Sequence, residues 1–459
     1  MTTEREIILD ALMEILEKKQ YSHLVMRATL DKYAYLPVQK RRFIKRCCEG
    51  TVEQMICIDH ALSQFSKTPV KKMKPLIRTV LRMSAYQILF MDSVPDSAAC
   101  NEAVSLAKKR GFTGLSGFVN GVLRSLSRGK NTIAYPDRST DPEGYLSIRY
   151  SMPRWIVTMW LQQYGEEKTE KMLEGLLAVR PVTIRMREGI SDAEKEQYLG
   201  HMTEDNITWE RDDTLPYAYY LQNVDNISGI PGFAQGRIAL QDIGSMWVVE
   251  LADIKKGDFV VDVCSAPGGK AIHAADKLCG SGSVLARDLT DYKISLIQDN
   301  IDRCKVSCMT TQVWDATIRD ESLTEKADVV IADLPCSGLG VIGRKGDIKY
   351  RVRQDDIAAI AALQKDILQA VWPYVKKGGT LMFSTCTVTA KENEGNRDWI
   401  LQNLQPILQP TCEEIQTLFP CLYCIQTLST TLPSASSNKN FFVPSIREVC
   451  SRRSFSAVK

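Results

Sequence analysis

Histidine and long apolar runs are both scarce in this sequence. Its 459 residues include four histidines, His23, His60, His201 and His273, which are too scattered to suggest a ligand cluster. No apolar run reaches the ~18 residues that a membrane-spanning helix needs. Residues 4–19 carry charges in every turn between apolar positions, which is typical of an amphipathic helix rather than a signal peptide. The expected location is therefore the cytoplasm.

A complete set of metal-ligand spacings is also lacking. The 14 cysteines are spread along the chain without an export signal, so reduced thiols are expected rather than disulfides. Cys421 and Cys424 have CxxC spacing, but no second CxxC or CxxH follows at zinc-site distance, and no metal site is predicted. The glycine-rich segment "CSAPGGK" (264–270) is neither a Walker loop nor a GxGxxG motif.

Positive charge is present, but it is concentrated at the front of the chain. Residues 1–130 hold 22 lysines and arginines against 12 acidic residues, although the net charge of the whole chain is only +3. The clusters are "KRRFIKR" (40–46), "KTPVKKMK" (67–74) and "KKR" (108–110). Basic clusters on a compact domain favour phosphate backbones. A solvated helix face explains a single charge run equally well, so both interpretations stay open here.

The first half of the chain predicts two different kinds of domain. Residues 1–130 show only helical periodicity, broken by prolines, at 4–19, 51–65, 75–91 and 98–110. Residues 131–144 have the composition of a linker. In 145–240, strand-like "RPVTIRMR" and "ITWERDD" alternate with helix-like "EEKTEKMLEGLLA" and "SDAEKEQYLGHM", which predicts a small α+β domain.

Strand and helix patterns alternate regularly from 241 to 410. The strand-like segments are 259–263, 283–288, 310–315, 328–333 and 380–385. This alternation predicts an α/β domain, with a parallel sheet covered on both faces and ligands bound at the carboxyl ends of the strands. Residues 411–459 are an atypical tail, because 415–438 contain no charged residue and show no clear period.

A glycine-rich turn stands between the first sheet strand and the next helix. In "VVDVCSAPGGKAIHAADKL" the glycines let the backbone approach a ligand closely, and the N–H groups that begin the helix would face it. Asp288 ends the next strand, where a carboxylate can accept both hydroxyls of a ribose. A Gly-Gly turn alone is as often a simple tight connection.

Two cysteines follow later strand ends. "IADLPCSGLG" places Asp333 and Cys336 at one such end, and "FSTCT" places Cys386 at another. A buried cysteine is usually a small apolar residue, and that interpretation holds for either one taken singly. Two thiols at the edge of one predicted nucleoside pocket favour a catalytic role for the pair instead.

These motifs, in this order, resemble the bacterial 16S rRNA (cytosine-5-)-methyltransferases of the RsmB/Sun/Fmu type. The resemblance covers about residues 1–410 and rests on "LQDIGSMWV", "DVCSAPGGK", "ADLPCSGLG", "GDIKYR" and "STCT" with the following "KENE". "VPDSAACNEAVSLAKKRGFTGLSGFVNGVLR" resembles the NusB-type helical RNA-binding domain. The implied multidomain fold is an all-α NusB-like domain (1–130), a small α+β RNA-binding domain (145–240) and a Rossmann-like α/β methyltransferase domain of the NOL1/NOP2/Sun type (241–410).

The resemblance also implies a donor and a set of roles. The donor is S-adenosylmethionine, and its pocket would be formed by Cys264, Ser265, Ala266, Pro267, Gly268, Gly269, Lys270, Asp288, Asp315 and Asp333. Cys386 would be the nucleophile and Cys336 would assist product release. Asp333 would contact the target base, and Lys270 is a candidate for lowering the pKa of the thiol. The RNA would be 16S rRNA, held by Arg344, Lys345, Lys349 and Arg351 and bound free or early in assembly by a monomer.

The departures from this family pattern keep one rival open. Gly346 stands where the family usually has proline, and only "KNFF" (439–442) echoes the final antiparallel pair of its sheet, so we expect an altered C-terminus whose last strands pair poorly. The rival function is an RNA-binding assembly or antitermination factor with an inert methyltransferase domain. An amino-methylating enzyme is disfavoured, because "DLPC" has cysteine where its aromatic residue would stand.

Overall fold

The computed structural model describes residues 2–178, 180–404, 407–408 and 422–426. These residues form two compact units, which are described separately. The first contains the chain up to Arg180 together with Gly338–Ile357, and the second contains Pro181–Ser337 and the residues from Ala358 onward. No helix within the described ranges combines the length and apolarity needed to cross a bilayer.

The described residues of the first unit form helices and no strands, and several of these helices begin at a side-chain cap or a proline. Thr3 and Glu6 form a capping box at the start of α1. Pro75 is the first residue of α5, and Pro37 and Pro95 directly precede α3 and α6. The helices are α1 (Glu4–Leu12, continued by a π-helical segment Met13–Glu17), α2 (Ser22–Lys32), α3 (Val38–Glu53), α4 (Met55–Phe65), α5 (Pro75–Phe90), α6 (Asp96–Lys109), α7 (Ser116–Gly129), α8 (Pro142–Arg149), α9 (Arg154–Tyr164), α10 (Glu166–Leu177) and α15 (Ile348–Arg351).

Residues 145–180 lie in this helical unit, whereas the sequence assigned them to the α+β domain. The reason is local. Helices α8 to α10 carry their own apolar faces and the first strand begins only at Val182. The loop after α8 is fastened to α4, because the hydroxyl of Ser151 accepts a hydrogen bond from the N–H of Ile56 at 3.0 Å. The boundary of the helical unit therefore lies near 180 rather than near 145.

The second unit begins with a small antiparallel sheet. Its strands are β1 (Val182–Met186), β2 (Thr208–Arg211), β3 (Ala218–Gln222) and β4 (Ile238–Leu240), in the order β2-β3-β1-β4. Ile184 and Met186 point into a core that the sheet shares with α11 (Asp192–Glu204). Because side chains alternate along a strand, Arg185 points away from that core, and it forms a buried ion pair with Asp276 at 2.6 Å.

The larger sheet has the strand order β10-β11-β9-β8-β5-β6-β7. The five parallel strands are β5 (Phe259–Asp262), β6 (Ser283–Asp288), β7 (Met309–Val313), β8 (Ala327–Asp333) and β9 (Val375–Ser384). All five agree with the strand-like segments of the sequence, which confirms the predicted Rossmann-like α/β fold. The order reverses between β5 and β8, where open sheets of this type bind ligands.

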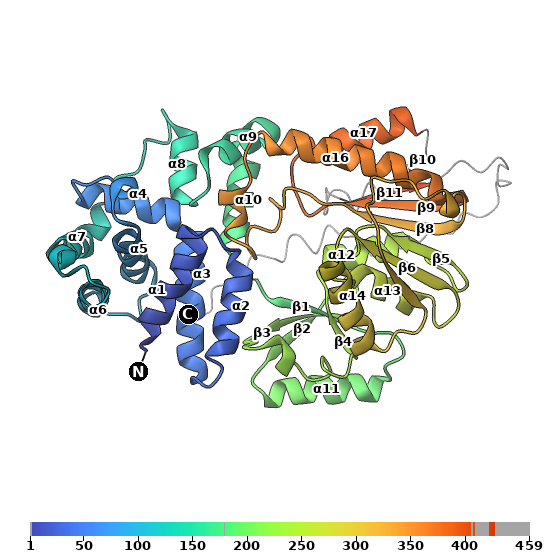
Figure 1. The fold of residues 1–459 in the computed structure, drawn as a ribbon, viewed down its shortest axis with the longest axis horizontal. Coiled ribbons are helices and arrows are strands. Elements are labelled where there is room, and N and C mark those ends of the chain that lie inside the picture. Colours follow the sequence, from blue (N-terminus) through green and yellow to red (C-terminus); the bar gives the residue numbers. More distant parts are fainter. Residues whose placement is uncertain (1, 179, 405–406, 409–421, 427–459) are drawn as a thin grey trace. The chain divides into compact units, whose positions relative to one another are not determined.

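Helices cover both faces of this sheet (Figure 1). On one face lie α12 (Ile243–Leu251), α13 (Gly269–Lys277) and α14 (Asp291–Cys304), which enclose a core that includes Val260 and Val329. On the other lie α16 (Asp356–Val371) and α17 (Glu394–Asn403), over Val261 and Val330. Consecutive valines therefore serve opposite cores, as the pleat of a doubly covered strand requires.

The last strands of the sheet are paired, contrary to the expectation that they would pair poorly. Strand β11 (Leu422–Gln426) runs antiparallel to β9 over five residue pairs, and β10 (Ile407–Leu408) is antiparallel to β11. Pairing to a long neighbour supplies the backbone hydrogen bonds of β11 without any charged side chain. The segment "KNFF" and Cys421 lie outside the described residues.

Candidate active site

The candidate site is the carboxyl edge of the larger sheet, where the loops after β5, β8 and β9 begin. The strand register aligns these loops, since Asp333, the last residue of β8, lies opposite Ser384, the last residue of β9. Cys336 follows three residues after the first and Cys386 two residues after the second. The register thus brings together two thiols that are 50 residues apart in the chain.

The loop after β5 needs its glycines for two separate reasons. Gly268 has φ +96°, and a Cβ there would lie 3.2 Å from the side chain of Ile297 on α14. Next to it, a Cβ at Gly269 would meet nothing within 4 Å, so the backbone borders open space. Helix α13 starts at Gly269 without a side-chain cap. Its first N–H groups have no partner within the helix and are suited to bind a carboxylate.

Asp288 closes this loop against the end of β6. One of its carboxylate oxygens accepts a hydrogen bond from the N–H of Ala266 at 2.9 Å. The other accepts bonds from the N–H of Leu289 and from the ammonium of Lys293, both at 2.8 Å. The carboxylate thus already supports the loop at the position where a ribose was predicted.

Lys270 and Asp333 form an ion pair beneath the thiols. The ammonium of Lys270 lies 2.5 Å from one oxygen of Asp333, and the hydroxyl of Ser384 donates to the other at 2.8 Å. Burial lowers the pKa of Lys270, but the negative charges of Asp333, Asp262 and Cys386 outweigh burial and raise it overall. Lys270 therefore keeps its positive charge and interacts electrostatically with Cys386, and its role in lowering the pKa of that thiol stays a prediction.

Cys336 and Cys386 contact each other directly but have different surroundings. Their sulfur atoms are 2.9 Å apart, and the N–H of Cys386 donates to the sulfur of Cys336 at 3.2 Å. Cys386 is exposed, whereas Cys336 is partly buried. The pKa of Cys336 is raised well above its usual value, mainly by the hydrogen bond with Cys386 and secondly by burial. The exposed thiol is thus suited to attack a substrate, and the other is suited to remain protonated and to donate.

Asp262 belongs to the site although sequence reasoning did not select it. It ends β5, and one of its carboxylate oxygens is buried without a hydrogen-bond partner, as is the hydroxyl of Ser265 in the following loop. Burial raises the pKa of Asp262 to about 7, although Lys270 opposes the shift. Its position at a strand end, like that of Asp288 and Asp333, was the available signal.

The remaining predicted pocket residues differ in exposure. Asp315 lies exposed after β7, and its carboxylate accepts bonds from the N–H and hydroxyl of Thr317 at 2.9 and 2.7 Å. Cys264 is partly buried after β5. Burial and the nearby carboxylates Asp262, Asp288 and Asp333 raise the pKa of its thiol, so it stays protonated at neutral pH.

The predicted RNA-binding segment folds with the helical unit, and two of its cations serve structure there. The ammonium of Lys349 is buried and donates to the backbone carbonyls of Glu53 and Ser151 at 2.7 and 2.6 Å. Burial lowers its pKa to about 8. Arg351 pairs with Asp347 at 2.7 Å and donates to the carbonyl of Lys19 at 2.9 Å. The expectation that Lys349 contacts RNA is therefore wrong for this conformation, because a buried ammonium cannot reach a phosphate.

The other two predicted RNA-binding residues, Arg344 and Lys345, are exposed in the same segment.

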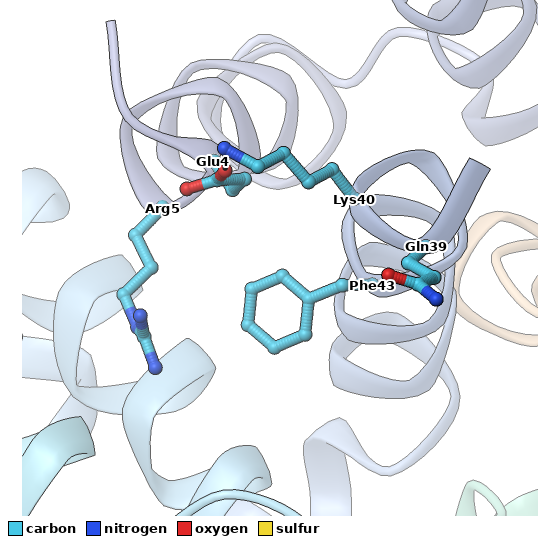
Figure 2. Close-up of a pocket in the computed structure, with 5 residues that line it drawn as sticks. All are labelled: Glu4, Arg5, Gln39, Lys40 and Phe43. Atoms are coloured by element: carbon cyan, nitrogen blue, oxygen red, sulfur yellow. Dashed lines mark ion pairs between the residues drawn. The ribbon is translucent and has the colours of Figure 1, made fainter. Parts of the chain in front are cut away.

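A separate surface pocket in the helical unit contains no predicted site residue (Figure 2). The ring of Phe43 lies at its centre, under the guanidinium of Arg5 at 5.3 Å, and Lys40 is paired with Glu4 at 2.5 Å. Its charges are satisfied locally, and it has no nucleophile.

Comparisons with known proteins identify two family regions in this chain. Residues 249–447 match the model described as 16S rRNA methyltransferase RsmB/F. Residues 2–128 match that of the NusB family. The first match contains the candidate site and the second contains most of the helical unit.

Whole-chain relatives agree with these matches. A protein of Bacillus subtilis named probable ribosomal RNA small subunit methyltransferase B is 36% identical over 86% of this chain and 87% of its own. A protein of the same name from Synechocystis is 30% identical over 88% of this chain and 90% of its own. The fold is similar to that of the crystal structure titled PH0851, with a TM-score of 0.73 at 23% identity over 88% of this chain and 90% of that one.

Proposed function

This chain belongs to the RsmB/F family of ribosomal RNA small subunit methyltransferases, and we propose that it methylates carbon 5 of a cytosine in 16S rRNA through a covalent bond to Cys386. The observation that carries the proposal is the pair of thiols, with sulfurs 2.9 Å apart at the sheet edge. Methylation of an exocyclic amine or a ribose hydroxyl requires no thiol. Two thiols in one site fit a reaction in which one adds to the ring and the other helps to release it.

Carbon 5 of cytosine is a weak nucleophile and must first be activated. The sulfur of Cys386 adds to carbon 6, which makes carbon 5 electron-rich like that of an enamine. After carbon 5 has gained its methyl group, it loses its proton to water, which reaches the exposed Cys386 adduct, and the electron pair of that C–H bond expels the thiolate from carbon 6. Both the ring and Cys386 are then restored.

Neighbouring groups have distinct roles in this scheme. Lys270 holds positive charge beside the thiolate. Asp333 is positioned by Lys270 and Ser384, and its carboxylate would accept a hydrogen bond from the exocyclic amine of the base. Cys336, whose pKa is raised, stays protonated until the release step and assists it through its contact with Cys386. The target base must leave its stack to reach these groups.

The methyl donor that fits the loop after β5 is S-adenosylmethionine, which supplies a methyl group activated by a sulfonium. The uncapped N-terminus of α13 and the unpaired hydroxyl of Ser265 suit its amino-acid end, in a pocket formed by Cys264–Lys270 and Asp333. Asp288, at the end of β6, would accept bonds from the ribose hydroxyls, and Asp315, which follows β7, would contact the adenine. The open space beside Gly269 admits a ligand.

For the RNA, we propose contacts by the exposed Arg344 and Lys345 and by the basic helical unit, with phosphate contacts setting affinity rather than sequence choice. The substrate would be free 16S rRNA or an early assembly particle, bound by a monomer in the cytoplasm. The alternative is an assembly or antitermination factor with an inert methyltransferase domain. Calorimetry with S-adenosylmethionine separates the two, because an inert domain would bind no donor.

The test is methylation of unmodified ribosomal RNA with labelled donor by wild type, Cys386→Ala and Cys336→Ala. We expect no product from Cys386→Ala. Cys336→Ala should accumulate a protein-RNA adduct that survives denaturant, because addition proceeds while release is impaired. Nuclease digestion of the product should yield 5-methylcytidine. A fully active Cys386→Ala enzyme would refute the covalent scheme.

A further inference from the structure

A buried carboxylate lies directly behind the two thiols. Glu392 is fully buried in the "KENE" segment that precedes α17. Its oxygens accept bonds from the N–H and hydroxyl of Ser337 at 2.8 and 2.6 Å and from the hydroxyl of Thr389 at 2.6 Å. The amide of Gln364 adds a longer contact of 3.4 Å. Hydrogen bonds from neutral groups therefore hold this carboxylate, which is costly to bury unless they are all made.

The bonds of Glu392 connect the two catalytic loops. Ser337 directly follows Cys336, and its hydroxyl lies 2.7 Å from that of Thr387, which directly follows Cys386. Because the Ser337 hydroxyl donates its hydrogen to Glu392, it can only accept from Thr387. A directed chain therefore runs from Thr387 through Ser337 to the carboxylate, and an acceptor at Glu392 sets its direction.

Further bonds hold the other side of each cysteine. The amide of Gln364 on α16 donates to the carbonyl of Pro335 at 2.8 Å, just before Cys336. Asn393, next to Glu392, accepts from the hydroxyl of Thr385 at 2.6 Å and donates to the carbonyl of Thr387 at 3.1 Å. Each thiol is thus held between two anchored neighbours.

We propose that Glu392 is a positioning residue that sets the distance between Cys336 and Cys386 for the two-thiol reaction. An apolar residue would fill the same buried space without the cost of desolvating a carboxylate. A carboxylate is used here because it accepts bonds from the N–H and the hydroxyl of Ser337 at once. This inference rests on the proposed function and adds to it the device that keeps both loops in register.

The test compares Glu392→Gln and Thr387→Val with Thr387→Ser and with Lys391→Ala, an exposed neighbour. Two quantities are measured for each. The first is kcat for RNA methylation, together with KM for the donor. The second is the rate at which diamide closes a 336–386 disulfide, followed by mass spectrometry of alkylated peptides. In that reaction both thiols lose a proton and an electron, and diamide is reduced to its hydrazine.

We expect Glu392→Gln and Thr387→Val each to lower kcat at least tenfold and to slow disulfide closure at least fivefold, with KM for the donor changed less than twofold. Thr387→Ser and Lys391→Ala should behave like wild type. Wild-type closure rates in both Glu392→Gln and Thr387→Val overturn the inference, as does unchanged kcat with slower closure. If Glu392→Gln does not fold, Thr387→Val decides alone.

Failure of the proposed function is distinguishable from failure of this inference. An active Cys386→Ala enzyme removes the covalent scheme, whatever the closure rates are. Disulfide closure needs no RNA and no donor, so it reports the distance between the thiols even in that case. If Cys386→Ala is inactive while Glu392→Gln keeps the wild-type kcat and closure rate, only the proposed role of Glu392 is refuted.

Discussion

At the scale of single residues, the candidate site combines side chains that follow strand ends with a buried hydrogen-bond network between the two cysteine loops. The sequence could identify the side chains that lie at or just after the ends of strands, because the strands themselves are recognised by their apolar runs. These side chains are Asp288, Asp333, Cys336 and Cys386. Glu392 stood out only as part of a family motif, because neither its burial nor its partners follow from local spacing. The role of Lys349 was mistaken for the same reason, since a lysine in a basic run reads as exposed until its carbonyl partners are known.

Asp262 predicts a specific dependence of stability on pH. Its pKa is about 7 in the folded protein and ~4 in an unfolded chain. Between these values the folded state holds a proton that the unfolded state has lost, so stability should fall as pH rises from ~4 to ~7. At about 1.4 kcal/mol per pKa unit, the loss is at most about 4 kcal/mol.

Urea unfolding curves from pH 5 to pH 8 measure this effect. Wild type should lose more stability over that range than Asp262→Asn, which cannot ionise. Asp253→Asn replaces an exposed carboxylate and should follow wild type. Parallel curves for wild type and Asp262→Asn would show that the buried carboxyl is not protonated in the folded state.

At the scale of elements, regular patterns predicted the structure and short strands escaped. Strands β5, β6, β8 and β9 contain apolar segments because both of their faces are buried, whereas the edge strand β7 is mostly exposed. Strand β4 has three residues and strand β3 has five. Both are too short for the alternation of apolar and polar residues to be recognised in the sequence. Strand β11 lies in an uncharged segment that shows neither helical nor strand periodicity. Its sequence therefore did not predict a strand, which forms by pairing with β9.

The segment 338–357 depends on one buried lysine. Lys349→Met keeps the apolar stem but leaves the carbonyls of Glu53 and Ser151 without their donor. An unsatisfied buried group costs about 1 to 3 kcal/mol, so with two such carbonyls we expect the helical unit to lose about 2 to 6 kcal/mol. Hydrogen exchange over 338–352 should become faster.

Lys345→Met is the matched control, since Lys345 is exposed four residues earlier in the same segment. It should leave stability and exchange near wild type. Unchanged exchange in Lys349→Met would mean that the two carbonyls find other donors and that α15 is held mainly by the packing of Tyr350.

At the scale of the whole molecule, the uneven charge distribution left two interpretations open, a surface that binds nucleic acid and a solvated helix face. Residues 1–130 carry the excess of positive charge, and the helical unit that contains them matches the NusB family. Composition alone left a solvated helix face as an equal alternative, because charge counts do not show which lysines are paired. The structure shows how individual lysines are used. Lys40 forms an ion pair with Glu4, and three further lysines, Lys71, Lys72 and Lys74, lie exposed on the surface.

These three lysines give the last prediction. Each lysine that neutralises a phosphate adds ~0.7 to 0.9 to the slope of log affinity against log salt. The triple variant Lys71→Ala, Lys72→Ala, Lys74→Ala should therefore bind 16S rRNA more weakly and reduce that slope by about 2 to 3, while KM for the donor stays constant. Removing the exposed Lys255, Lys256 and Lys305 of the other unit removes the same total charge. If both triple variants lower the slope equally, net charge rather than a defined surface of the helical unit attracts the RNA.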